Sequence, residues 1–365
     1  MPISEALLNK IRTRPIESKL DLSGEGLCDE DLAALTDILA CIKELDLSYN
    51  DIGDHGAMTL AGIGTIEFLD LHNGLRGYDS YENHITATGA KALAETGLKK
   101  LNLSGNPIGN QGIEFLASNK TITELRVSDC DISDQGSSTL FKVNSTITKV
   151  DLSTNALQDN GVKTLAANHT LKELDLSNCG IHEDGALCIS ENDSLTRLKL
   201  SANGIKNKGA TRLAAHPALV SLDLRGCDIS DDGIAAFSSN SGIQELFLSD
   251  NQITQEGLKR LSGNHSLVCL HLSNNPIEFD EETLKVLTGI ETLRIFKGDN
   301  KISDEMITRA RDLCAKTAVQ EFDLMACGGF MNTNFLRYRA KKKAEEETPD
   351  FAEPRTDANK KNRYF

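Results

Sequence analysis

Residues 147–166 read ITKVDLSTNALQDNGVKTLA, and the pattern returns 24 residues later, from residue 171, as LKELDLSNCGIHEDGALCIS. Apolar and polar residues alternate in the first half of this stretch, which predicts a short strand with one buried face. A glycine and apolar residues at helical spacing follow, so the second half predicts a turn and a short helix. Such a unit leaves its apolar faces bare, and only stacked neighbours bury them in one core. We therefore expect an α/β solenoid, with a curved parallel β-sheet on the concave face and short helices on the convex face.

The unit recurs along most of the chain. A degenerate unit at 17–40 comes before the clear ones, which begin at residues 42, 66, 98, 122, 147, 171, 195, 219, 243, 267, 290 and 319. Strands about 4.8 Å apart then give a sheet roughly 53 Å long, which is a protein-sized surface. We expect an N-terminal cap at 1–18 and a solenoid of about 12–13 units at 19–330. For 331–365 we expect a cap helix, from Asn334 to Glu347, and a disordered tail.

Two insertions interrupt the period, near 72–82 and near 296–299. Insertions in a solenoid leave it from one edge, commonly on the binding side. The first insertion holds Arg76, Tyr78 and Tyr81, whose residue types are enriched at binding hot spots. We predict that this loop contacts a partner, and a tolerated mobile insertion is the alternative.

One polar position recurs at the end of every predicted strand. It is occupied by Asn50, Asn83, Asn106, Cys130, Asn155, Cys179, Asn203, Cys227, Asn251, Asn275, Asn300 and Cys327. A buried asparagine amide can satisfy the backbone groups that the turns leave under the stack, where an unpaired group costs about 1–3 kcal/mol. We therefore predict a structural role for this ladder, its cysteines included. The alternation of asparagine and cysteine between 106 and 251 indicates units duplicated in pairs.

The repeat resembles the leucine-rich-repeat family. The phrases GAMTLA from Gly56, GAKALA from Gly89, GVKTLA from Gly161 and GATRLA from Gly209 resemble the GALA-type repeats of secreted bacterial effectors, and the paired units are similar to ribonuclease-inhibitor-like proteins. The resemblance implies a non-enzymatic, protein-binding effector that blocks or recruits a host protein or a fellow effector. An adaptor in a ubiquitin-ligase complex is the alternative, although the stretch before the repeats is too short for the F-box of GALA proteins.

The charge balance limits the class of partner. The chain carries 39 Lys and Arg against 54 Asp and Glu, a formal net charge of −15. Nucleic acid and anionic membranes are bound mainly by basic surfaces, so we expect neither, and a protein partner, preferably a basic one, is favoured. No stretch has the length of a membrane span, and the N-terminus lacks the apolar core of a signal peptide. The nine cysteines are therefore expected to be reduced thiols. We expect a monomer.

The polar C-terminal stretch resembles the translocation signals of Dot/Icm type IV effectors. Such signals often hold a glutamate block, here Glu345, Glu346 and Glu347. The resemblance implies a virulence protein that lies in the bacterial cytoplasm before secretion and in the host-cell cytoplasm afterwards. Solvated charge without a role in secretion is the alternative.

Motifs for catalysis, a cofactor or a metal are not found. The histidines and cysteines have no zinc-site spacing, and nothing resembles a phosphate loop or a catalytic triad. A cysteine-dependent enzyme is the alternative of a different class, and it needs a thiol with a lowered pKa beside a base.

The predicted binding residues lie at outward-facing strand positions in the C-terminal half of the sheet. Phe247 is a large aromatic residue on a polar strand face, where it has no packing role. We predict that it centres a partner-binding site on the concave face, together with Glu245, Cys269, His271, Arg294, Arg197, Lys199 and Arg225. An aromatic residue ringed by Arg, His and Glu is typical of a protein-binding hot spot, and a harmless exposed phenylalanine is the alternative.

Overall fold

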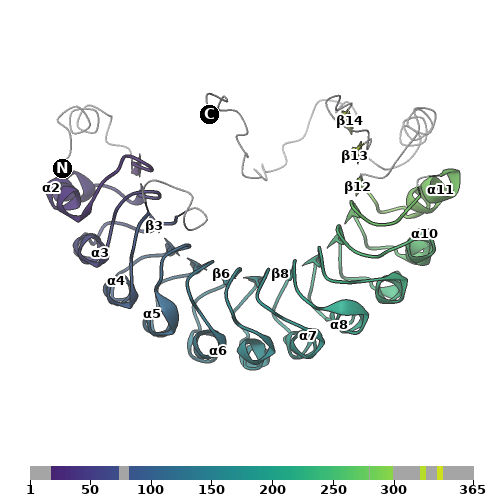
Figure 1. Ribbon diagram of the computed structural model, residues 1–365, viewed down its shortest axis with the longest axis horizontal. Helices are drawn as coiled ribbons and strands as arrows, with labels where there is room; N and C mark the ends of the chain where they lie inside the picture. Colours follow the sequence, from purple (N-terminus) through teal and green to yellow (C-terminus); the bar gives the residue numbers. More distant parts are fainter. Residues whose placement is uncertain (1–17, 74–81, 279, 299–320, 326–334, 340–365) are drawn as a thin grey trace, which may run out of the picture.

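The computed structural model describes residues 18–73, 82–278, 280–298, 321–325 and 335–339, with side-chain surroundings up to residue 294. Figure 1 shows an open arc in which the strands line the inner side and the helices line the outer side. Strand, turn and helix follow one another unit by unit, so the predicted solenoid is confirmed. No helix in the described ranges is long and apolar enough to cross a membrane.

Within the described residues, the strands form one 14-stranded sheet whose order follows the chain. Neighbouring strands pair in parallel, except that the last strand pairs antiparallel with the one before it. The strands are β1 (Lys19–Asp21), β2 (Glu44–Asp46), β3 (Phe68–Asp70), β4 (Lys100–Asn102), β5 (Glu124–Arg126), β6 (Lys149–Asp151), β7 (Glu173–Asp175), β8 (Arg197–Lys199), β9 (Ser221–Asp223), β10 (Glu245–Phe247), β11 (Cys269–His271), β12 (Ile295–Gly298), β13 (Glu321–Met325) and β14 (Phe335–Arg339).

Short helices return the chain from one strand to the next. A side chain at Gly185 would lie 2.5 Å from Asp159 Oδ1 and 2.7 Å from Ile181 Cγ2, so the recurring glycine lets neighbouring units approach closely. The α-helices are α2 (Asp29–Leu39), α3 (Asp54–Ala61), α4 (Ala87–Ala94), α5 (Gly109–Ala117), α6 (Asp134–Val143), α7 (Glu183–Ser190), α8 (Lys206–Ala214), α9 (Asp231–Ile234), α10 (Gln255–Arg260) and α11 (Glu281–Gly289). The 3-10 helices are η1 (Asp159–Val162), η2 (Leu165–Ala167), η3 (Ala235–Ser239) and η4 (Leu261–Gly263).

The core lies between the sheet and the helices and runs through all the units. In β1–β11 the middle residue of each strand points into it, as Leu198, Leu222 and Leu246 do, and each of these three is at most 1% exposed. Burying one such leucine contributes about 1.5–3 kcal/mol. The first and last residues of these strands point the other way, which leaves them for the concave face.

The predicted asparagine ladder is confirmed along the described repeats. The Asn203 amide donates to the carbonyls of Leu176 at 2.8 Å, Leu200 at 2.9 Å and Ser201 at 3.3 Å. At the cysteine rungs a thiol takes this place, and Cys179 Sγ donates to the Leu152 carbonyl at 3.2 Å. These cysteines are therefore structural, as expected, whereas Asn300 and Cys327 lie outside the described residues.

The two kinds of rung come with two kinds of turn, which explains their alternation. Asn203 Oδ1 accepts the N–H groups of Cys179 at 3.1 Å and Ile181 at 2.9 Å in the preceding unit. A cysteine rung offers no such oxygen. Before it, Gln158 takes a φ of 55° and donates its N–H to the Cys179 carbonyl at 2.9 Å. The same turn occurs at Gly109 (φ 60°) before Cys130 and at Lys206 (φ 52°) before Cys227.

Replacing Gln158 by glycine is expected to stabilise the protein by about 1 kcal/mol. Gln158 has φ 55° and ψ −178°, a region that glycine adopts without the clash of a Cβ. Thermal unfolding of the two proteins measures the gain. The matched control is Ser133→Gly, at the same place of a repeat that has the other turn. Ser133 has φ −105° and its hydroxyl caps α6, so this change should destabilise, and two changes of the same sign would contradict the explanation.

A second ladder, which the sequence analysis missed, lies at the ends of the helices. Asn192 Nδ2 donates to the carbonyls of Leu165 at 2.9 Å and Asn168 at 2.7 Å, and its Oδ1 accepts the N–H groups of Ser194 and Leu195. The other asparagines of this ladder are Asn119, Asn144, Asn168, Asn240 and Asn264. Asn144 and Asn168, which begin the sequences Asn-Ser-Thr and Asn-His-Thr, therefore have a structural role in this second ladder.

The degenerate unit at 17–40 contributes the first strand, β1, which agrees with the expected start of the solenoid at residue 19. Two details of the prediction differ from the structure. Residues 296–298 belong to β12 and are not an insertion. Phe335–Arg339 is a strand and not the start of a cap helix, because its backbone completes the sheet edge that β13 leaves open. The rest of the predicted cap helix and tail lies outside the described residues.

Candidate functional site

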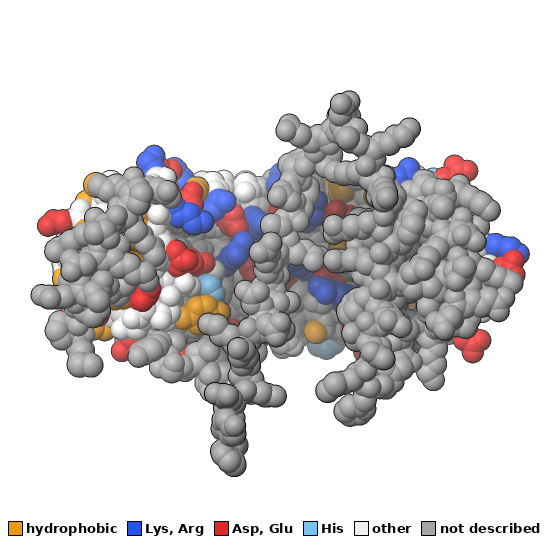
Figure 2. Space-filling view, turned by 90° about the horizontal axis from the view of Figure 1, so that it is seen from above, with side chains coloured by type: hydrophobic (Ala, Val, Ile, Leu, Met, Phe, Trp, Pro, Cys, Tyr) orange, Lys and Arg blue, Asp and Glu red, His pale blue; other side chains and the backbone are white. Residues whose placement is uncertain are grey.

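The concave face consists of the first and last residues of the strands, with the turn residue two positions later. The parallel register aligns these residues into rows that run along the arc. The acidic side chains in the rows of β1–β11 are Asp21, Glu44, Asp46, Asp70, Glu124, Asp151, Glu173, Asp175, Asp223 and Glu245; the basic ones are Lys19, Lys100, Arg126, Lys149, Arg197, Lys199 and Arg225. Figure 2, which looks onto this side, shows acidic and basic side chains interspersed where the described surface is visible.

Ion pairs fix most of these charges in the middle of the arc. Glu124 lies 3.3 Å from Lys100, 3.1 Å from Arg126 and 3.7 Å from Lys149, and Lys149 also lies 3.3 Å from Glu173. Burial opposes ionisation of Glu124, but the charges of Lys149 and Lys100 outweigh it and lower its pKa. The centre of the face is therefore internally neutralised, and it offers a partner little unpaired charge.

The structure brings several of the predicted site residues together around Phe247. Phe247 is half-buried on β10, and its ring packs edge-on against His271 with 4.6 Å between ring centroids. The backbone register places Asp223 on its other side. Glu245 reaches across β9 to Arg197, with 2.8 Å between Oε2 and Nη1, because the intervening residue is the small Ser221.

Two of the predicted basic residues are held by neighbouring carboxylates. Arg225 binds Asp223 through Nε and Nη2, with a shortest distance of 2.6 Å, and this hydrogen bond raises the pKa of the guanidinium. Lys199 turns away from β10 and pairs with Asp175 on β7 at 3.1 Å. Cys269 is only 9% exposed, so it contributes little surface.

The prediction that Arg294 occupies an outward-facing strand position is wrong. The register pairs His271 with Lys297, and Arg294 lies before β12, where its N–H donates to the Val268 carbonyl at 2.8 Å. Its guanidinium donates to the carbonyls of Glu291 and Leu293. The repeat that begins near residue 290 is displaced by three residues from the expected frame, because Thr292 takes the place of Ser266 and bonds a carbonyl of the preceding unit.

The first insertion is anchored by a pair of buried asparagines. Asn73 Nδ2 donates to the Asn83 carbonyl at 2.6 Å, and the Asn83 N–H donates to Asn73 Oδ1 at 2.7 Å. The loop thus leaves the solenoid through a closed neck directly after β3. The side chains predicted to bind a partner, Arg76, Tyr78 and Tyr81, lie outside the described residues, as do Glu345, Glu346 and Glu347.

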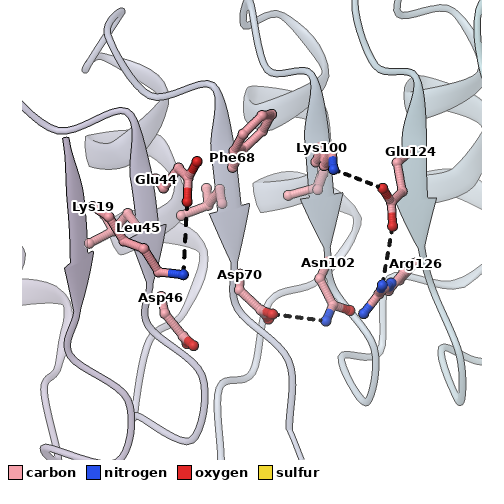
Figure 3. A pocket seen from close by; sticks show the side chains of 12 residues that line it. Lys19, Glu44, Leu45, Asp46, Phe68, Asp70, Lys100, Asn102, Glu124 and Arg126 are labelled. Carbon is pink, nitrogen blue, oxygen red and sulfur yellow. Dashed lines mark hydrogen bonds and ion pairs between the residues drawn. The ribbon is translucent and has the colours of Figure 1, made fainter. Parts of the chain in front are cut away.

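An aromatic site that the sequence analysis missed lies next to this neck. Phe68 is the first residue of β3, in a row otherwise filled mainly by charged side chains, and this contrast is the signal that could have found it. Figure 3 shows its ring projecting between Glu44 and Lys100, and Lys100 Nζ lies 5.0 Å from the ring centroid. Tyr49 packs edge-on against His72 at 4.9 Å between centroids.

The charges beside Phe68 are partly paired. His72 Nδ1 lies 2.7 Å from Asp70 Oδ1. Burial works against both charged forms, but the hydrogen bond between them prevails, which raises the pKa of His72 and lowers the pKa of Asp70. Asn102 also donates to Asp70 at 3.1 Å. The side chains of Phe68, Asp46 and Asp70 line a shallow hollow of about 250 Å³.

Two cysteines of the strand-end ladder lack the lowered pKa that a nucleophilic thiol would need. Burial raises the pKa of Cys179 and of Cys227 to about 12, so both thiols stay protonated and are poor nucleophiles. Within the described ranges, no group of three or more His, Cys, Asp or Glu side chains could hold a metal ion. Cys314 and Cys327 lie outside them.

Comparison with known proteins identifies the repeat. Two sequence models described as leucine-rich repeat match the chain, one at residues 39–61, 96–117, 118–141, 143–166, 167–190 and 191–214 and the other at 217–277. The chain is a leucine-rich-repeat protein. The matched ranges fall within the part of the chain where strands and helices alternate unit by unit in the structure.

This leucine-rich-repeat protein is similar to RAN GTPase-activating protein 2 of Arabidopsis thaliana, with 33% identity over 121 residues, or 30% of this chain and 21% of the plant protein. The chain thus spans about a fifth of the length of that relative. Among solved structures, the TLR13–ssRNA13 complex is similar with a TM-score of 0.53 and 24% identity, over 81% of this chain and 41% of that chain. An internalin (inlF) from Listeria monocytogenes gives a TM-score of 0.47 and 18% identity, and the match covers 81% of this chain and 94% of the internalin chain. These structural likenesses concern the fold.

Proposed function

We propose that the protein is a non-enzymatic interaction module that binds a folded protein through its concave face. The observation that carries this proposal is the placing of Phe68 and Phe247. Both rings are half-buried and stand on the outward side of the sheet, where neighbouring strands carry mostly charged or small polar residues and where the core gains nothing from them. Aromatic side chains set among polar and charged neighbours are the usual anchors of a protein interface.

The rest of the face supports a protein partner over nucleic acid. Its rows hold ten acidic and seven basic side chains, as named above, and a net negative surface repels phosphates. The two asparagine ladders hold the strands in fixed register, so little conformational freedom is lost on binding. The plant relative's name makes a small GTPase one partner class to assay first.

Loss of the Phe247 ring is expected to weaken binding of the partner at least tenfold. A central aromatic side chain in an interface commonly contributes about 2 kcal/mol or more. The test is affinity capture from host-cell and source-bacterium lysates with the wild type and with Phe247→Ala, followed by titration of the captured protein. Leu187→Ala is the matched control, because Leu187 is 38% exposed on α7, on the convex side. Equal losses in both variants would contradict the proposal.

Within this function, the resemblance to GALA-type and ribonuclease-inhibitor-like repeats supports an effector role. The protein would be delivered from the bacterial cytoplasm into a host cell by a type IV system, and there it would block a protein or recruit it to a ubiquitin ligase. The test is a translocation reporter fused to the full chain. Glu345–Glu347→Gln is expected to reduce translocation about tenfold while capture of the partner is unchanged, since the glutamate block follows the repeats in the sequence. Translocation at the wild-type level would count against a secretion signal there.

A further inference from the structure

The hollow over β1–β5 differs from the rest of the concave face in how its carboxylates are paired (Figure 3). Most acids in the middle of the arc have Lys or Arg partners, as Glu124, Glu173 and Asp175 do, and Asp151 is the exception. In the hollow, Asp46 Oδ1 accepts the Ser48 N–H at 3.0 Å and the Ser48 hydroxyl at 2.6 Å, which are neutral donors. No Lys or Arg among the described residues forms an ion pair with Asp46 or Asp70.

The register brings these carboxylates together. Asp46 pairs with Asp21 on one side and with Asp70 on the other, so three aspartates stand in line on neighbouring strands about 4.8 Å apart. Glu44 adds a fourth carboxylate in the neighbouring row, and its ion pair with Lys19 is long, at 3.9 Å. Against these acids, β1–β4 carry two basic side chains at the same positions, Lys19 and Lys100. The acidic excess of the concave face is therefore concentrated at this end.

Phe68 gives the hollow an aromatic wall. Lys100 already lies 5.0 Å from the ring centroid, so the ring is oriented to accept a cation, and the other side faces Glu44 in Figure 3. A ring beside carboxylates suits a long basic side chain, whose stem packs on the ring and whose head reaches the acids. A guanidinium fits best, because its planar fork can bind two carboxylate oxygens at once.

We propose that this hollow is the docking site for an arginine-bearing segment of the protein partner. The guanidinium lies between the carboxylates of Asp46 and Asp70, and its stem packs against Phe68. The inference rests on the proposed function, since it names the chemistry of the partner that the concave face binds. Among the described acids of the central strands, Asp151 also lacks an ion pair with Lys or Arg, but its neighbours in the row are Arg126 and Asp175, and Asp175 is paired with Lys199. This hollow is therefore the place where a basic side chain is drawn.

The test is fluorescence anisotropy of the full chain with a labelled nonapeptide of alternating arginine and serine, at about 0.15 M salt, where nonspecific attraction is screened. Asp46→Asn keeps the acceptor for Ser48 and removes the charge, and it should weaken binding about tenfold. Phe68→Leu should weaken it about threefold. The matched controls are Asp151→Asn, an aspartate at the same repeat position with the same serine contacts, and Phe115→Leu, whose ring on the convex helix α5 lies 5.5 Å from Lys91 Nζ.

The expected result is that the two control variants bind the arginine peptide with a Kd within twofold of the wild-type value. Equal weakening by Asp46→Asn and Asp151→Asn would show general electrostatic attraction and overturn the proposal. No binding of the arginine peptide at all, or equal binding of a peptide with glutamate in place of arginine, would overturn it as well. If a partner is captured through Phe247 while the arginine peptide fails, the proposed function stands and this inference alone falls.

Discussion

Replacing Asn203 by alanine is expected to lower the free energy of unfolding by about 3–5 kcal/mol. The amide bonds five backbone groups from two units, the N–H groups of Cys179 and Ile181 and the carbonyls of Leu176, Leu200 and Ser201. Alanine leaves several of these groups buried without a partner, and each costs about 1–3 kcal/mol. Urea unfolding measures the loss. Hydrogen exchange should show faster exchange first at the amides of Cys179 and Ile181.

The matched control is Cys179→Ala, on the neighbouring rung. Its thiol donates one weak bond to the Leu152 carbonyl at 3.2 Å and a longer one to Ser177 at 3.5 Å, and it accepts none of the N–H groups. This change should therefore cost about 1–2 kcal/mol. If both variants lose the same stability, the ladder is held by packing and not by the asparagine amide, and the explanation of the two turns fails.

Replacing His216 by asparagine is expected to stabilise the protein by about 2 kcal/mol at neutral pH. His216 occupies the place of an asparagine in the second ladder and is only 4% exposed. Its Nδ1 accepts the Ala218 N–H at 3.2 Å, but its buried Nε2 has no hydrogen-bond partner. An asparagine there can donate to the carbonyls of Ile189 and Asn192, as Asn192 does to Leu165 and Asn168 one unit earlier.

The gain from His216→Asn should widen as the pH falls. Burial lowers the pKa of His216, and the charge of Asp193 offsets this only in part. The unfolded chain takes up a proton near pH 6.5, whereas the folded protein does so only at lower pH. The wild type therefore loses stability as the pH falls below about 6.5, and the asparagine variant is spared this loss. Urea unfolding at pH 7.5 and pH 5.5 measures the difference, and an equal gain at both values would contradict the assignment.

Most of the fold can be predicted from the repeat period in the sequence alone. The alternation around Leu174 and Leu222 and the helical spacing after each glycine determine strands and helices, because stacking gives each unit the same neighbours. The period gave a wrong prediction in the repeat near residue 290, where the same sequence fits the repeat pattern in two registers. Ile290 and Leu293 both begin an acceptable pattern, and the hydrogen bond of Thr292 to the Leu267 carbonyl selects the second. That bond depends on the preceding unit, which the local pattern does not include.

The binding site was less predictable than the fold. The register shows that Phe247 and His271 are neighbours, and their contact follows from the sequence. The ion pair of Arg197 with Glu245 forms across the small Ser221 and depends on the rotamers of two long side chains. The repeat pattern in the sequence does not specify these rotamers. Phe68 and the second ladder did leave signals. One is an aromatic residue in a charged row. The other is an asparagine two residues before a Ser/Thr-Ile/Leu pair in most of these units, and both required comparing units at more than one position.

The most direct test of the concave face as a binding surface is site-specific photo-crosslinking. A benzophenone side chain is placed at Phe247 or Phe68 on the concave side, or at Leu187 on the convex side, in the full chain. It is then irradiated in the lysate from which the partner is captured. We predict one discrete crosslinked protein from both concave positions and none of it from Leu187. Crosslinking of the same protein from Leu187 alone would contradict the account.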